Sequence, residues 1–209
     1  ARLAACLGRD DLPDELAAER NATLRRAVTW LSTAWPHSTE DAAFRLLGLV
    51  WADAPRDTIA AAGRVLLSLQ LPAGGWPQLP AYAADAYSTG EALYALRASG
   101  MPSSAAEWQR GARFLVASQA ADGSWHVRSR LVSPADVSPP YFHTGFPYGD
   151  KDEFLSYAGS CWATMALLSS LPEAAGGTPV GRALLGSSGG SDNARATDAG
   201  TPAWLRTAL

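Results

Sequence analysis

The chain has 209 residues, a formal net charge of −3 and an isoelectric point near 5.6. It contains no cluster of basic residues, so it lacks the positive surface that nucleic-acid-binding proteins need. Its apolar stretches fall short of the roughly 18 residues required to span a bilayer, so we expect no transmembrane segment. The first residues include no initiator methionine and no long apolar signal segment, which indicates a piece of a larger protein.

Helical periodicity runs through most of the chain and indicates an all-α protein. The first predicted helix carries Leu24, Val28 and Leu31 on one face. The second begins after the cap residue Ser38, and the fourth begins near a similar cap at Ser88, 50 residues later. The six predicted helices cover residues 12–35, 39–54, 56–71, 86–100, 103–121 and 154–171.

Two of these helices carry specific expectations about burial. The second helix places Phe44, Leu47, Val50 and Trp51 on one stripe, which predicts a core-facing surface. The sixth helix is apolar on nearly all sides, so we expect it to be buried on both sides.

A short motif ends the third and the fifth predicted helices. In each copy a glutamine is followed four residues later by a glycine, and two residues after that by a tryptophan. Glycine tolerates the positive φ of a helix-ending turn, glutamine can hydrogen-bond the unpaired loop backbone, and tryptophan can fold back over the helix end. The copies lie 49 residues apart and consist of Gln70, Gly74, Trp76 and of Gln119, Gly123, Trp125. They predict an internal repeat of helix pairs.

These motifs resemble the QW motif of squalene–hopene and related triterpene cyclases. The second copy matches at every defined position, namely Arg110, Gly111, Phe114, Leu115, Gln119, Gly123 and Trp125. The first copy departs at two positions, with Ala61 in place of a basic residue and Val65 in place of an aromatic one. A Gly-Phe-Pro stretch around Phe146 extends the resemblance toward the end of the chain. In that family the motifs brace helix ends and lie away from the catalytic centre.

The resemblance implies the α/α toroid of the terpenoid cyclase and prenyltransferase repeat superfamily. Three helical hairpins, each with one inner and one outer helix, would form an arc, a partial α6/α6 barrel. An upstream half of a longer chain, terminal caps or a second copy would then complete the arc. Residues 1–172 form this predicted repeat domain, and residues 173–209 form a Gly- and Ser-rich tail that we expect to be flexible.

Triterpene cyclisation needs a strong acid and an apolar cavity lined by aromatic rings that stabilise carbocations. The resembled family carries the acid in a D-x-D-D motif, which this sequence lacks. The nearest candidates are Asp150 and Asp152 at the start of the sixth helix, where the charge of Lys151 and the helix dipole oppose proton donation. Helix capping is the simpler role for both acids, and also for Asp85 before the fourth helix.

Several aromatic and apolar side chains on the predicted inner helices and in the Gly-Phe-Pro stretch could bind an apolar substrate, or could simply pack the core. These residues are Tyr87, Tyr94, Phe146, Trp162 and Met165. We expect the chain to bind an isoprenoid or other apolar ligand as part of a larger cyclase-related protein, which would be an isomerase if active. The alternative is a non-catalytic helical-repeat module that contacts another protein.

The sequence indicates neither a metal nor a cofactor. Cys6 and Cys161 lie far apart, and the three histidines show no ligand spacing. No phosphate-binding glycine loop or nucleophile elbow is present.

Overall fold

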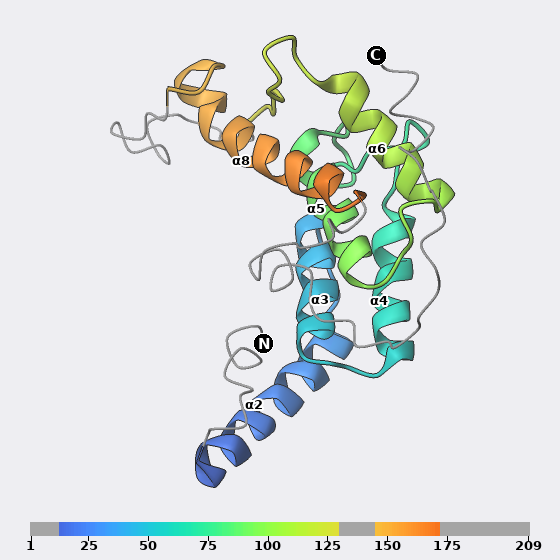
Figure 1. Ribbon diagram of the computed structural model, residues 1–209, viewed down its shortest axis with the longest axis vertical. Coiled ribbons are helices and arrows are strands. Elements are labelled where there is room, and N and C mark those ends of the chain that lie inside the picture. The colour runs from blue at the N-terminus through green and yellow to red at the C-terminus, as the bar shows by residue number, and fades with distance from the viewer. Residues whose placement is uncertain (1–12, 130–144, 172–209) are drawn as a thin grey trace. The chain divides into compact units, whose positions relative to one another are not determined.

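A computed structural model describes residues 13–129 and 145–171 (Figure 1). The chain divides into two units, and the described residues all belong to the first, Ala1–Pro172. The expectations for the tail at 173–209 and for Cys6 therefore lie outside the described residues. Within the described ranges every regular element is a helix, which confirms the all-α fold class.

The helices are α2 (Asp14–Thr33), α3 (Thr39–Trp51), α4 (Arg56–Ser68), α5 (Ala86–Ala98), α6 (Ala106–Ser118) and α8 (Gly149–Leu168). Each corresponds to a helix predicted from the sequence, but α8 begins at Gly149 rather than at Phe154. Tyr148 and Gly149 have φ values of 91° and 67°, which turn the chain directly into the helix. The acidic stretch that follows therefore forms the first turn of α8.

Helix α5 lies at the centre of the packing and contacts α3, α6 and α8, while α4 packs on α3 (Figure 1). Nearly every residue of α5 from Ser88 to Leu96 is buried. Gly90 lets α5 and α8 approach closely, because a Cβ atom there would lie 2.5 Å from the carbonyl carbon of Trp162. Helices α3, α5 and α8 therefore pack side by side in that order. Helix α4 packs against α3, and α6 packs against α5.

Helix α2 is attached more loosely than the others. None of its residues is buried, and its main contact is with α3, where Leu31 lies against Gly48. The predicted apolar face of Leu24, Val28 and Leu31 is therefore only half-buried. None of the helices in the described part of the chain combines the length and the apolar character needed to cross a bilayer.

Two expectations about buried faces are wrong in part. Phe44 is 42% exposed, because the buried face of α3 runs instead through Ala43, Leu46 and Leu47. Helix α8 is buried against α5 on one side only. Its other side exposes a stripe of side chains that we call the α8 stripe, made of Phe154, Tyr157, Cys161 and Leu168. Apolar composition alone did not distinguish a doubly buried helix from one with an exposed apolar face.

Candidate functional site

The first Gln-Gly-Trp motif closes the end of α4 as the sequence predicted. The indole of Trp76 is fully buried, and its Nε1 donates to the carbonyl oxygen of Leu66 at 2.8 Å. Nε2 of Gln70 donates to the carbonyl oxygen of Gly74 at 2.8 Å. Gly74 has a φ of 100°, which a side chain with Cβ rarely adopts. The motif therefore braces the helix that it follows.

The second motif repeats these interactions atom for atom at the end of α6. Nε1 of Trp125 donates to the carbonyl oxygen of Leu115 at 2.8 Å, and Nε2 of Gln119 donates to that of Gly123 at 2.8 Å. Gly123 again has a positive φ, of 86°. Trp125 is only 3% exposed. The equal geometry of the two copies supports an internal repeat.

Each motif is also tied to a later helix by a hydroxyl group. Oγ1 of Thr89 on α5 accepts a hydrogen bond from the backbone N–H of Trp76 at 2.9 Å. Oγ of Ser160 on α8 accepts one from the backbone N–H of Trp125, also at 2.9 Å. The motifs therefore act as structural joints, consistent with the brace role that the resemblance implies.

Two of the predicted ligand-binding residues, Tyr94 and Trp162, lie in contact, with ring centroids 5.7 Å apart. Trp162 also meets Phe44 edge-on at 6.2 Å. We call these three residues the inner cluster, which joins α3, α5 and α8. Tyr94 is buried, Trp162 is half-buried and Phe44 is largely exposed, so the cluster reaches the surface through Phe44.

Tyr87 lies on α5 and donates from its hydroxyl to Oε1 of Glu40 at 3.3 Å. Burial, and then the negative charges of Glu91 and Glu40, raise the pKa of Tyr87 above its ordinary range. Its phenol therefore stays protonated and acts as a donor. Glu91 is 1% exposed, and the sequence analysis missed it. The available signal was an acid in the middle of an otherwise apolar helix.

Two other singled-out residues have simpler positions. Oδ1 of Asp85 accepts a hydrogen bond from the backbone N–H of Ser88 at 2.9 Å, so Asp85 caps α5, as expected. Met165 is half-buried on α8 and does not belong to the inner cluster.

Asp152, in the first turn of α8, binds the segment that follows the second motif. Its Oδ1 accepts from the backbone N–H of Ser129 at 2.7 Å, and its Oδ2 lies 2.9 Å from Nε2 of His126. Burial alone raises the pKa of Asp152, but the hydrogen bonds from Ser129 and His126 and the positive charge of Lys151 lower it overall. Asp152 is therefore held ionised. The lowered pKa agrees with the effect expected from the charge of Lys151. The side chain of Asp150 lies outside the described residues.

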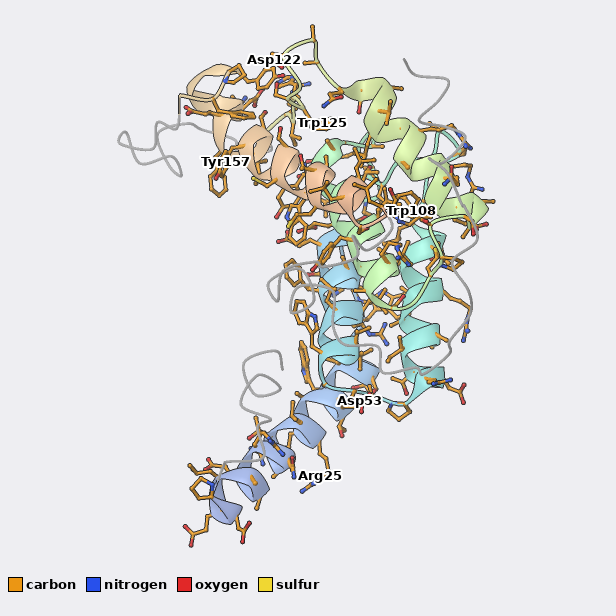
Figure 2. All side chains as sticks on the ribbon, viewed as in Figure 1. Arg25, Asp53, Trp108, Asp122, Trp125 and Tyr157 are labelled. Atoms are coloured by element: carbon orange, nitrogen blue, oxygen red, sulfur yellow. The ribbon has the colours of Figure 1, made fainter. Side chains whose placement is uncertain are left out.

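A row of stacked and edge-on rings leads from His126 to α8. The His126 ring stacks on Tyr148 at 4.7 Å between centroids, and Tyr148 lies 6.2 Å from Phe146. Phe146 in turn meets Tyr157 edge-on at 5.8 Å. We call these four residues the aromatic ladder. Figure 2 shows the Tyr157 side chain directed outward from α8. The predicted ligand residue Phe146 thus belongs to the ladder and not to the inner cluster.

Tyr148 is held in an unusual conformation at the centre of this ladder. Its φ of 91° is strained for a residue with a side chain. Its hydroxyl lies 2.6 Å from Oγ of Ser124. The hydroxyl of Ser124 donates its hydrogen to Oδ1 of Asp122 at 2.6 Å. The side-chain and backbone hydrogen bonds from Ser124 lower the pKa of Asp122 against a small opposing effect of burial. This chain of contacts fixes the ring of Tyr148 against His126.

The α8 stripe lies beside both aromatic groups. Phe154 is 50% exposed, Tyr157 45% and Leu168 57%, although all three are large apolar or aromatic side chains. Large apolar side chains that are exposed along one face of a helix are typical of interaction sites. Tyr157 belongs to both the stripe and the ladder, so the two surfaces are continuous.

In the ranges that the structure describes, no group of three or more His, Cys, Asp or Glu side chains is placed to hold a metal ion. No protein-family model matches the chain, and no curated protein matches it in sequence.

Proposed function

We propose that this chain is a terpenoid-cyclase-like repeat module that binds an isoprenoid or other apolar ligand along α8. The observation that carries the proposal is the exposed α8 stripe, which has the inner cluster beside it and the aromatic ladder at its end. An extended hydrocarbon chain would cover side chains that are otherwise in water, and each covered aromatic ring favours binding.

The two motif joints support the toroid part of the proposal. In a toroid of helical hairpins the inner helices follow one another and each outer helix is braced at its end. Helices α3, α5 and α8 have this order, and Trp76 and Trp125 provide the braces. We propose that the hairpins form an arc whose inner helices carry the ligand, with a further part of a larger cyclase-related protein or a second copy completing it.

The proposal is one of binding rather than of cyclisation. Proton-initiated cyclisation requires a carboxylic acid that is protonated before it meets the substrate. Asp152, the acid that the sequence singled out, is held ionised by Ser129 and His126. At the end of the ladder Asp152 is placed to orient the ring of His126, and not to donate a proton to a ligand.

Calorimetric titration with a C20 isoprenoid hydrocarbon tests the proposal. Replacing Phe154 and Tyr157 by serine should weaken binding at least about tenfold, because covering one aromatic side chain contributes about 1.5–3 kcal/mol. Trp30→Ser is the matched control, since Trp30 is 68% exposed but lies on α2, away from the stripe. Unchanged affinity in the double variant would contradict binding along α8.

The second candidate is a non-catalytic module that contacts another protein, and α2 favours it. This helix buries none of its residues, and Trp30 and the following Trp35 are 68% and 75% exposed. Large exposed aromatic residues are typical of protein interfaces. If this candidate holds, Trp30→Ala and Trp35→Ala should abolish capture of a protein partner, while Phe154→Ser should leave it unchanged.

A further inference from the structure

We propose that the apolar ligand carries a hydrogen-bond-donating end group, such as the hydroxyl of an isoprenoid alcohol, and that Nδ1 of His126 accepts this bond. The inference rests on the proposed function and adds the chemistry of one end of the ligand. It follows from the contacts that His126 makes with Asp152 and with the aromatic ladder.

The first step concerns the tautomer of His126. Nε2 of His126 lies 2.9 Å from Oδ2 of Asp152, whose other oxygen accepts from the backbone N–H of Ser129. An ionised carboxylate only accepts hydrogen bonds, so Nε2 must carry the proton. In a neutral imidazole the other nitrogen is then an acceptor. Asp152 thus directs a hydrogen-bond acceptor, Nδ1, away from itself.

The second step concerns access. The side chain of His126 is 52% exposed, and within the described part of the chain no group hydrogen-bonds Nδ1. The ring is nevertheless fixed, because it stacks on Tyr148 while Nε2 is held by Asp152. An acceptor that is both exposed and immobile can receive a ligand group with little further loss of conformational freedom.

The third step concerns the path of the ligand. The ladder runs from His126 through Tyr148 and Phe146 to Tyr157, which is also part of the α8 stripe. A ligand chain that lies on the stripe can therefore continue along the ladder and end at the imidazole. A pure hydrocarbon would cover the rings but could not donate a hydrogen bond to Nδ1.

The test compares geranylgeraniol with its methyl ether, which can accept a hydrogen bond but cannot donate one. Wild-type protein should bind the alcohol about fivefold to tenfold more tightly than the ether, the contribution of one hydrogen bond. The ratio of the two affinities is the readout, because differences in ligand size affect every protein variant alike.

Asp152→Asn should remove this preference without abolishing binding. The backbone N–H of Ser129 would still donate to the amide oxygen, so the amide NH2 would face Nε2 of His126. Nε2 then becomes the acceptor and the proton moves to Nδ1, which turns into a donor that suits alcohol and ether alike. The affinity ratio should fall to about one. His126→Phe should also remove the preference, and Asp57→Asn, in the first turn of α4, should retain it.

The outcomes separate this inference from the proposed function. Equal affinity for alcohol and ether in the wild type, or an unchanged ratio in Asp152→Asn, overturns the inference while apolar binding stands. Tighter binding of geranylgeranyl phosphate than of the alcohol also overturns it, because an anionic group would require a cationic His126. Failure of the alcohol, the ether and the parent hydrocarbon to bind at all overturns the proposed function itself.

Discussion

Nη2 of Arg110 donates a hydrogen bond to Oε1 of Gln70 at 2.7 Å, so the basic residue of the second motif holds the glutamine of the first. Nε2 of the same glutamine also donates to the carbonyl oxygen of Glu107 at the start of α6, at 2.8 Å. The basic position of a motif therefore serves the preceding repeat.

Arg110→Met should lower the free energy of unfolding by about 1 kcal/mol, since it removes one side-chain hydrogen bond. The nearby pair of Arg110 and Glu107, 3.9 Å apart and half exposed, contributes little to this loss. Urea unfolding of a double-mutant cycle with Gln70→Ala should show coupling of similar size. The same cycle with Gln119→Ala should be additive within about 0.5 kcal/mol, and coupling there would contradict the assignment.

Trp76→Ala and Trp125→Ala should each lower the free energy of unfolding by about 3–5 kcal/mol, because each removes a fully packed indole and leaves a cavity. Thermal unfolding followed by circular dichroism measures the effect. Trp30→Ala on α2 should change stability by less than about 0.5 kcal/mol, because that side chain is mostly in water. An unchanged melting temperature in either motif variant would rule out the brace role.

Gly90→Ala should destabilise the contact between α5 and α8 by about 1–3 kcal/mol, because the added Cβ would overlap the backbone of Trp162 and Ala163. Gly63→Ala on α4 is the matched control, since beyond its chain neighbours and the backbone of its own helix no atom lies within 4 Å of its Cβ position. That change should be neutral or stabilise by up to about 1 kcal/mol, through higher helix propensity. Equal effects in chemical denaturation would contradict the close approach of α5 and α8.

Acid should weaken the attachment of the segment around His126 to α8. The pKa of Asp152 in the folded chain lies below its ordinary value of 3.8, so the unfolded chain takes up the proton first as the pH falls. The stability that this carboxylate contributes is therefore complete above that value and is lost as the pH falls below it. Asp152→Asn should be less stable than the wild type at pH 7, and the two stability curves should converge in acid. Parallel curves would show that the carboxylate contributes nothing.

The sequence predicted the helices and the motif turns because both depend on local patterns. Gln70, Gly74 and Trp76 lie within one helix end, so their spacing alone determined which atoms could meet. The pairing of His126 with Asp152 was not predictable in this way, because 26 residues separate them and only the folded chain brings them together.

The exposed side of α8 and the buried acid on α5 show the same limit. The sequence of an apolar helix does not show which of its sides another helix will cover. The predicted burial of the sixth helix on both sides therefore placed Phe154 and Tyr157 in the core. The burial of Glu91 depends on the packing of α5 against three other helices, which no local pattern around this residue reveals.

The hydroxyls of Thr89 and Ser160 have a consequence for how such chains arise. Each accepts a hydrogen bond from the backbone N–H of the tryptophan in the turn before it. A hairpin such as α5–α6 therefore carries an acceptor in its first helix and a donor in the turn that closes it. A gene duplication that copies one hairpin therefore also copies the means of attaching it.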